Sequence, residues 1–425
     1  MADATAEIIT ATWRAEYGRL VGALTRMTRD LDLAEDVAQD ALVTALEQWP
    51  SRGIPDNPAA WLLTTARQRA IDSFRRADSL RRKTEELGQR LREEDEMPDL
   101  TTHVDYIEDD VLRLIFMACH PQLSPESRAA LTLRLVGGLT TAEIARGFLA
   151  TESAMGQRIS RAKKLLTEVR AEFELPVGDE RVARLDDVMA VVYLIFNEGY
   201  TATAGSDWMR TDLTNEAIRL ARMLAELIPD EPEVYGLQAL LELQASRSAA
   251  RADARGRPIL LDGQDRRLWD ELLIRRGLAA LNRAEVLAAR GKPVGRYYLQ
   301  AAIASVHARA ATPEETDWPA IAAWYDVLAK AAPGPVVEVN RAVAHGRAFG
   351  PDAGLKVLDQ LPDGALAGSH LLPSVRADLL ARAGRNAEAA ESFREAASLT
   401  HNESEQLLLL RRADESESAT SNVLH

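Results

Sequence analysis

The chain has 425 residues, 46% of them hydrophobic, one cysteine and a formal net charge of −14. Its length predicts about two to four domains, and abundant Ala and Leu with few β-branched alternating runs predict an all-α fold. The single cysteine excludes an intramolecular disulfide, and the acidity excludes a protein that coats nucleic acid by charge alone. Nothing in the sequence resembles a signal peptide or a membrane span, so we expect a cytoplasmic protein without a membrane partner.

Three helices are predicted in a first domain, residues 1–78. Apolar spacing places them at 5–29, 33–49 and 57–76. The chain is expected to break after the second helix at Pro50, Gly53 and Pro55, and Asn57-Pro58 caps the third. The third helix and its extension carry seven basic residues against two acids, which indicates a nucleic-acid-binding face or an ordinary solvated one: Arg67, Arg69, Arg75, Arg76, Arg81, Arg82 and Lys83.

A charged linker is predicted at residues 79–109. It turns from basic at Arg81 to acidic at Glu93–Glu96, as expected for a flexible tether. A helix then runs from Asp109 to Cys119. Cys119-His120 is too small a set for a four-ligand zinc site, so we expect a packed turn and no cofactor or metal.

Two short helices with a tight turn between them are predicted at 139–166. Thr140 or Thr141 opens the first, and Thr151 or Ser153 opens the second. Apolar residues of the second helix recur at four, three and four positions, and its other face is basic and polar. This is the pattern of a DNA-reading helix-turn-helix, although a helical hairpin with a solvated basic face gives it too. Residues 111–179, with nine basic and seven acidic side chains, form a net-positive block in an acidic chain.

Residues 180–412 are predicted to form a solenoid of paired helices, with a disordered polar tail at 413–425. The segment around Gly384 and Phe393 resembles a tetratricopeptide repeat, with Gly at the tight turn and an aromatic residue in the groove. Two stretches interrupt the pattern. The first is the polar cluster Asn197–Tyr200 after an apolar helix, which favours a helix cap with Gly at the turn over a ligand pocket. Asp265–Asp270 is either an interface patch or a helix start with Trp269 in the core.

Several of these motifs together resemble one family. Asp32 to Asp40 is similar to the acidic region-2 motif of bacterial sigma factors. Pro58 to Arg76 is similar to the promoter-melting helix of the extracytoplasmic-function subfamily, and 139–166 is similar to region 4. With Phe196–Tyr200 and the segment from Trp269, the layout resembles the group with a C-terminal tetratricopeptide-like extension.

The resemblance implies roles for named residues. Asp36, Gln39 and Asp40 would bind the β′ subunit of core RNA polymerase, which with the β subunit is the expected partner. The loop Trp49–Asn57 would accept an unstacked base of the −10 element. Arg67, Arg69, Arg75 and Arg76 would contact promoter DNA, and the linker would thread toward the polymerase active centre. Region 4 (110–178) would contact the −35 element through Thr151, Ser153, Gln157, Arg158, Ser160, Arg161 and Lys164.

Three residues depart from the family pattern. Gln68 stands where Asn is usual, and Ala154 and Gly156 stand where Thr and Lys are common. Gly156 removes a side chain that could reach DNA, which leaves the −35 preference open.

The expected function is therefore transcription initiation, with no covalent chemistry of its own. The resemblance implies that the chain recognises −10 and −35 elements, aids melting, and is controlled by its C-terminal domain through contact with the sigma domains or an unknown regulator. A conventional helix-turn-helix regulator with a helical sensory domain is the alternative. Its weakness is that it needs neither the acidic nor the basic helix of residues 1–78. An adaptor built around the solenoid is a third possibility, and no nucleophile or phosphate-loop motif supports an enzyme.

Overall fold

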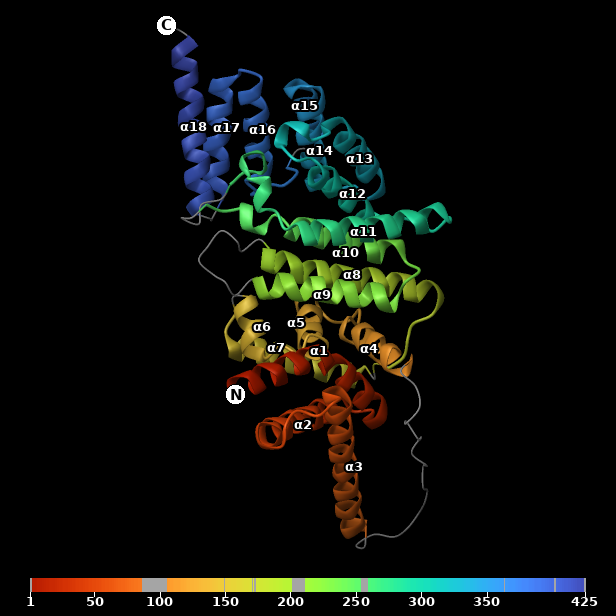
Figure 1. Ribbon diagram of the computed structural model, residues 1–425. Helices are drawn as coiled ribbons and strands as arrows, with labels where there is room; N and C mark the ends of the chain where they lie inside the picture. The colour runs from red at the N-terminus through yellow and green to blue at the C-terminus, as the bar shows by residue number, and fades with distance from the viewer. Residues whose placement is uncertain are drawn as a thin grey trace. The chain divides into compact units, whose positions relative to one another are not determined.

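The computed structural model describes residues 2–85, 105–148, 150–169, 171, 173–200, 211–253, 259–362, 364–400 and 403–423. Within these ranges the regular elements are helices and no strand is present, which confirms the all-α prediction (Figure 1). The chain divides into two compact units, Met1–Glu198 and Gly199–His425.

The first unit begins with three helices around a shared core. They are α1 (Ala2–Thr28), α2 (Leu31–Arg52) and α3 (Pro58–Glu85). Asp30 caps α2 by accepting from the backbone N–H groups of Asp32 and Leu33, at 3.0 and 3.1 Å. The predicted break at Pro50 is wrong, because α2 runs through this proline to Arg52 and ends where Gly53 takes φ +88°. A proline there removes a hydrogen bond only from the last turn, so the helix tolerates it.

The linker prediction is also partly wrong. Helix α3 continues to Glu85, and α4 (Asp105–Ala118) already begins at Asp105, so both ends of the expected tether are helical. Strong helix formers such as Arg, Lys and Glu account for the extension of α3. The acidic run Glu93–Glu96 lies outside the described residues.

The helix-turn-helix domain consists of α4, α5 (Pro125–Leu135), α6 (Thr141–Gly147) and α7 (Glu152–Glu168). Thr140 and Glu143 form a reciprocal capping box on α6, and Thr151 caps α7, so both predicted helix starts are confirmed. The predicted apolar stripe of α7 is buried: Met155, Ile159, Ala162 and Leu166. Cys119 is buried in a turn, and its sulfur lies 3.5 Å from the Thr132 hydroxyl.

Helix α8 (Gly178–Tyr200) follows. Its first half packs on the helix-turn-helix domain, where Arg128 pairs with Asp187 at 2.9 Å and Arg184 donates to the Phe116 carbonyl. The predicted cap at Asn197–Tyr200 is wrong, because α8 continues through these residues. Gly199 is tolerated inside a helix whose neighbouring residues are largely buried.

The second unit is a succession of helices that pack on their neighbours in the chain, as the solenoid prediction requires (Figure 1). Gly384 takes φ +75° at the tight turn before α17, and Phe393 is buried, as predicted from the repeat-like segment. The helices are α9 (Thr211–Leu227), α10 (Pro232–Ala245), α11 (Glu271–Ala289), α12 (Arg296–Arg309), α13 (Trp318–Ala331), α14 (Pro335–Phe349), α15 (Pro351–Leu358), α16 (Leu371–Arg382), α17 (Asn386–Leu399) and α18 (Glu403–Val423).

The structure decides two predictions for this unit, the environment of Trp269 and the state of the C-terminal tail. Trp269 is buried and Asp270 caps α11, so the core alternative holds for this segment. The tail prediction is wrong: α18 runs to Val423, with Ala413 and Ser416 buried. The prediction rested on the polar composition of the tail, whereas the helix forms because it packs against α17.

Candidate polymerase and nucleic-acid interfaces

One face of α2 is exposed and carries the three residues expected to bind a protein partner. Asp36, Gln39 and Asp40 are all exposed. The same face continues to Val43 and Leu46, which are 52% and 47% exposed. Acidic groups beside exposed aliphatic side chains at this spacing form a candidate docking surface. We did not predict Val43 and Leu46, although their helical spacing was a signal: Val43 lies three residues after Asp40, and Leu46 lies three residues after Val43.

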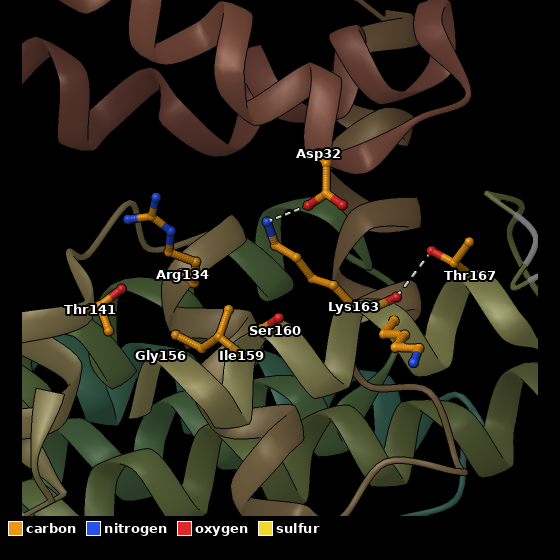
Figure 2. Close-up of a pocket in the computed structure, with 9 residues that line it drawn as sticks. Asp32, Arg134, Thr141, Gly156, Ile159, Ser160, Lys163 and Thr167 are labelled. Carbon is orange, nitrogen blue, oxygen red and sulfur yellow. Dashed lines mark hydrogen bonds and ion pairs between the residues drawn. The ribbon is translucent and has the colours of Figure 1, made fainter. Parts of the chain in front are cut away.

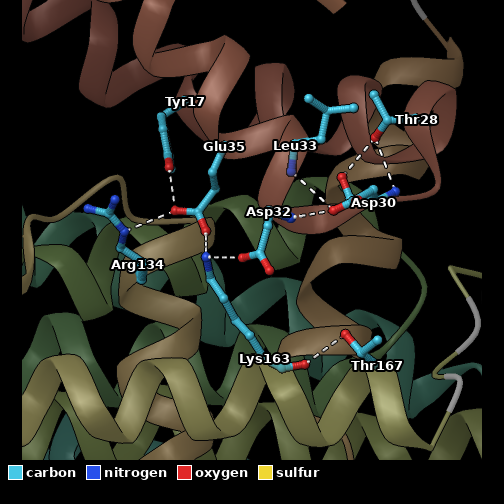
Figure 3. Close-up of polar contacts among 9 residues, drawn as sticks. All are labelled: Tyr17, Thr28, Asp30, Asp32, Leu33, Glu35, Arg134, Lys163 and Thr167. Carbon is cyan, nitrogen blue, oxygen red and sulfur yellow. Dashed lines mark hydrogen bonds and ion pairs between the residues drawn. The ribbon is translucent and has the colours of Figure 1, made fainter. Parts of the chain in front are cut away.

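The first turns of α2 face inward and join the two domains of this unit. Glu35, with a side chain 4% exposed, accepts from Tyr17 at 3.1 Å and from Arg134 at 2.9 Å. Lys163 of α7 pairs with Glu35 and, at 2.8 Å, with Asp32 (Figure 3). We call these five residues the Glu35 network. It ties α1 and α2 to α5 and α7.

Burial strengthens the electrostatics of the Glu35 network. Burial raises the pKa of the Tyr17 phenol above its usual value, and Glu35 adds to the effect, so Tyr17 stays a donor. Burial alone would lower the pKa of Lys163, but Glu35 and Asp32 outweigh it, so the pKa lies above its usual value. Lys163 is therefore charged across the physiological range.

Close backbone packing supports the same contact. Glycines 18 and 22 lie one turn apart on α1. A Cβ on Gly18 would lie 3.1 Å from the Val136 carbonyl oxygen, and one on Gly22 would lie 2.9 Å from that of Asp110. Arg26 pairs at 3.1 Å with Asp110, whose side chain is fully buried. The helix-turn-helix domain thus packs tightly against α1.

A small pocket of about 360 Å³ lies at the end of α2, where a base-accepting loop was predicted. Trp49 and Trp61 stand edge to face beside it, with ring centroids 5.4 Å apart. Its lining comprises Gln48, Trp49, Arg52, Gly53, Ile54, Pro55, Asp56 and Trp61.

Trp49 is only 2% exposed, so it contributes a pocket wall rather than an outer DNA-binding surface. Its indole N–H is buried and has no hydrogen-bond partner among the described residues. An aromatic wall with an unused donor suits a flat heteroaromatic ring such as a nucleobase.

The other −10 candidates lie on or next to α3. Asn57 caps this helix, accepting from the Ala60 N–H at 3.0 Å. Arg69 and Arg75 are exposed, and Arg67 is half-buried. Arg69 also donates to the Thr44 hydroxyl at 3.3 Å. The side chain of Arg76 lies outside the described part of the structure.

Helix α7 presents the candidate −35 residues on its polar face. Ser153, Gln157, Ser160, Arg161 and Lys164 are exposed, as is the cap Thr151, whereas Arg158 is half-buried. Ser160 and Lys164 also line a cavity of about 450 Å³ that α7 shares with Asp32 and Arg134 (Figure 2). Both side chains therefore border the space between the two domains while remaining exposed to solvent.

Lys163 forms a contact that the sequence did not predict. It counted only as one of the basic residues of the helix, yet its side chain is 19% exposed and turned toward α2. Its position one residue after the buried Ala162 was a signal that it borders the apolar stripe.

Comparisons with known proteins match three segments of the chain. The family described as "Sigma-70 region 2" matches residues 12–80, "Sigma-70, region 4" matches 113–166, and a family of unknown function, DUF6596, matches 184–285. The chain belongs to the extracytoplasmic-function sigma factors that carry a C-terminal extension. Sigma factors act in transcription initiation, and here α1–α3 form region 2 and α4–α7 contain region 4.

Relatives of this sigma factor differ in how much of the chain they cover. An uncharacterized protein, R00370 of Rhizobium meliloti, is 43% identical over 93% of the chain and 92% of its own length. The "Probable ECF RNA polymerase sigma factor SigI" of Mycobacterium tuberculosis is 25% identical over 41% of the chain and 59% of its own length. SigX of Bacillus subtilis is 27% identical over 33% of the chain and 72% of its own length. No solved structure matches.

Two further properties concern the described residues alone. None of the helices described combines the length and hydropathy of a membrane span. No group of His, Cys, Asp and Glu side chains in the described ranges could hold a metal ion.

Proposed function

We propose that this sigma factor binds core RNA polymerase through the exposed face of α2 and directs it to promoters. The observation that carries the proposal is that face itself, with Asp36, Gln39 and Asp40 beside exposed Val43 and Leu46. A conventional regulator that reads DNA through α7 has no use for an acidic and apolar surface on another domain. The resemblance to sigma factors points to the β′ subunit as its partner.

The pocket between Trp49 and Trp61 supports recognition of the −10 element. Extracting a base from duplex DNA requires unstacking it, and an aromatic pocket offsets part of that cost. Arg69 and Arg75 on α3 supply positive charge for the phosphates of the melted strand. This arrangement would both recognise the element and favour melting.

Helix α7 is the candidate reader of the −35 element. Its outward residues Gln157 and Arg161 are donors and acceptors of the kind that read base edges in the major groove. Gly156 has no side chain that could contact a base, so recognition of the −35 element would depend on the neighbouring positions of α7.

Reading both elements requires the two domains to separate. The elements are centred about 25 base pairs apart, which is about 85 Å along B-DNA at about 3.4 Å per pair. Regions 2 and 4 instead pack directly on each other through the Glu35 network and the glycines of α1. We infer that this closed arrangement is the free form and that polymerase and promoter DNA open it.

The C-terminal unit is the candidate controller of this opening. It makes up more than half of the chain, and a sigma factor needs only regions 2 and 4 to contact polymerase and promoter. The regulation would act on the exposed surfaces of region 2 or region 4, or through an outside protein.

In vitro transcription tests the proposal directly. The full chain is combined with core RNA polymerase on a promoter library, beside an Asp36→Lys/Asp40→Lys variant. We expect promoter-specific transcripts from the wild type and at least a tenfold loss from the variant, with binding to promoter DNA alone unchanged.

A matched charge reversal on exposed α18, Asp414→Lys/Glu415→Lys, is the control and should transcribe normally. DNA binding without transcription by the wild type would favour the conventional regulator. Equal activity of both double variants would remove the α2 face from the polymerase interface.

A further inference from the structure

A short segment of the second unit, residues 259–270, reaches between helices that are distant in sequence; we call it the strap. Its second half is firmly anchored. Arg266 donates to the carbonyls of His307 and Ala310, at 3.0 and 2.7 Å, and to the Thr316 hydroxyl at 2.7 Å. Trp269 is buried, and the Asp270 N–H donates to the Ser246 carbonyl.

The tip of the strap, residues 259–263, is held differently. Asp262 pairs with Arg347 of α14 and, at 3.6 Å, with Arg382 of α16. The other hydrogen bonds given for the described residues of the tip are local turns, apart from two at Ile259. Its N–H donates to the Arg251 carbonyl, and its carbonyl accepts from the Gln264 side chain at 3.2 Å. Leu260 is 54% exposed. The tip can therefore leave the two arginines without disturbing the anchors behind it.

The two arginines form a rigid acceptor for an anion; we call them the arginine clamp. Arg347 stacks over the Trp318 ring at 5.2 Å, and among the described residues Asp262 is its only ion-pair partner. Arg382 also pairs with Asp378 at 2.9 Å. Helices α14 and α16 meet closely because Gly346 leaves space that Leu379 fills, which fixes the spacing of the two guanidinium groups.

Charge decides what the clamp accepts. Arg347, Arg382 and Arg412 surround Asp378, which pairs with both Arg382 and Arg412. Without Asp262, three positive charges face one negative charge. Arg347 and Arg382 then have donors free for a carboxylate, the group that a planar guanidinium matches best.

We propose that the arginine clamp is a docking site for an acidic segment of a partner protein, and that Asp262 occupies it in the free chain. The structure already displays the recognised chemistry: a carboxylate on a turn, with exposed Leu260 beside it. Asp262 is 43% exposed and its pairs are partly solvated, so the occupant exchanges with a competitor. The proposal concerns the second unit alone and does not depend on promoter recognition.

A labelled peptide with the sequence of residues 259–264, capped at both ends, serves as the probe. Its binding to the full chain is followed by fluorescence anisotropy in the wild type and in Asp262→Asn. We expect the variant to bind at least tenfold more tightly, because the tethered competitor is gone. Arg347→Ala added to the variant should abolish the gain, and a peptide with Asn in place of its Asp should not bind.

Hydrogen exchange of the wild type gives a second readout that does not require the variant to fold. Saturating peptide should speed exchange at the N–H groups of Gly263 and Gln264, whose turn bonds form the tip. Unchanged exchange, or no tighter binding by Asp262→Asn, would overturn the proposal. Displacement of the peptide by inorganic phosphate at equal concentration would overturn it too, because the clamp would then be a small-anion site.

Discussion

Two carboxylates in this molecule each hold distant segments together, and they differ in burial. Glu35 is 4% exposed and is bonded by Tyr17, Arg134 and Lys163 at the contact between regions 2 and 4. Asp262 is 43% exposed and pairs with two arginines of the second unit. Both carboxylates pair with cationic side chains, but one pair is buried and the other is partly exposed to water.

The difference determines what each contact can do. Removing one partner from a buried charge network leaves other charges desolvated and unpaired, whereas an exposed pair is largely replaced by water. We therefore expect the Glu35 network, which we call the lock, to break only when a large new interface replaces it. We expect the Asp262 contact, by contrast, to exchange with a competing carboxylate.

The largest effect is expected from breaking the lock itself. Glu35→Ala leaves Arg134 and Tyr17 without their carboxylate and Lys163 with only Asp32. We expect the free energy of unfolding of the first unit to fall by about 3–5 kcal/mol. Native-state hydrogen exchange of α2 and α7 in urea measures this loss.

Asp36→Ala, on the exposed face of the same helix, is the matched control and should change the stability by less than about 0.5 kcal/mol. A loss of under about 1 kcal/mol for Glu35→Ala would mean that the network does not join the two regions.

A half-buried histidine beside the strap, His307, extends the comparison to the effect of pH. Burial, reinforced by Arg247 and Arg266, lowers the pKa of His307 to about 4. The unfolded chain binds this proton near its ordinary pKa of about 6.5, so stability present above pH 6.5 is lost as the pH falls toward 4. The contribution is about 2–3 kcal/mol at pH 4.5.

His307→Gln removes this titration. The difference in unfolding free energy between wild type and variant, followed by hydrogen exchange in α12, should therefore shrink by that amount between pH 7.5 and 4.5. A difference that does not vary with pH would show that His307 is not held neutral.

Gly22→Ala tests the packing of the closed form apart from its charges. The new Cβ would meet the backbone oxygen of Asp110 at 2.9 Å, and backbone cannot move aside cheaply. We expect a destabilisation of about 1–3 kcal/mol and a wider separation of regions 2 and 4 in small-angle scattering. Unchanged stability and scattering would indicate that α1 and α4 are not in close contact in solution.

The smallest effect is expected at Gly156, where the same substitution should stabilise. A Cβ there meets only the Thr141 side chain, at 3.8 Å, and the residue sits in the interior of α7. Gly156→Ala should raise the stability of this helix by about 1 kcal/mol, measured by urea unfolding. Destabilisation would reveal a backbone conformation at 156 that only glycine tolerates.

Local signals in the sequence predicted much of this structure. The helix start at Thr140, the start of α7 at Thr151 and its buried stripe all depend on nearest neighbours along one helix, and they were confirmed. The polar composition of residues 413–423 led to the wrong prediction of a disordered tail. Helix α18 is stabilised by packing on α17 rather than by its own helix propensity.

The closed arrangement could not be predicted from the sequence. Glu35 and Lys163 lie 128 positions apart, and each reads as an ordinary charged residue of an amphipathic helix. Only the fold brings them together and buries them. The same holds for Asp262, whose partners lie 85 and 120 positions away. The candidate polymerase-binding residues were predicted through resemblance, and the structure adds the exposed Val43 and Leu46 beside them.

The opening of the lock is the central claim, and one distance tests it. Cys119 is buried and its pKa is raised to about 11, so dyes attach selectively to cysteines introduced at exposed Gln68 and Glu168. Energy transfer between the two dyes is compared in the free chain and in the complex with core polymerase and promoter DNA. We predict high energy transfer in the free chain and a large decrease of the transfer in a complex that transcribes. High transfer that persists while transcripts form would contradict the account.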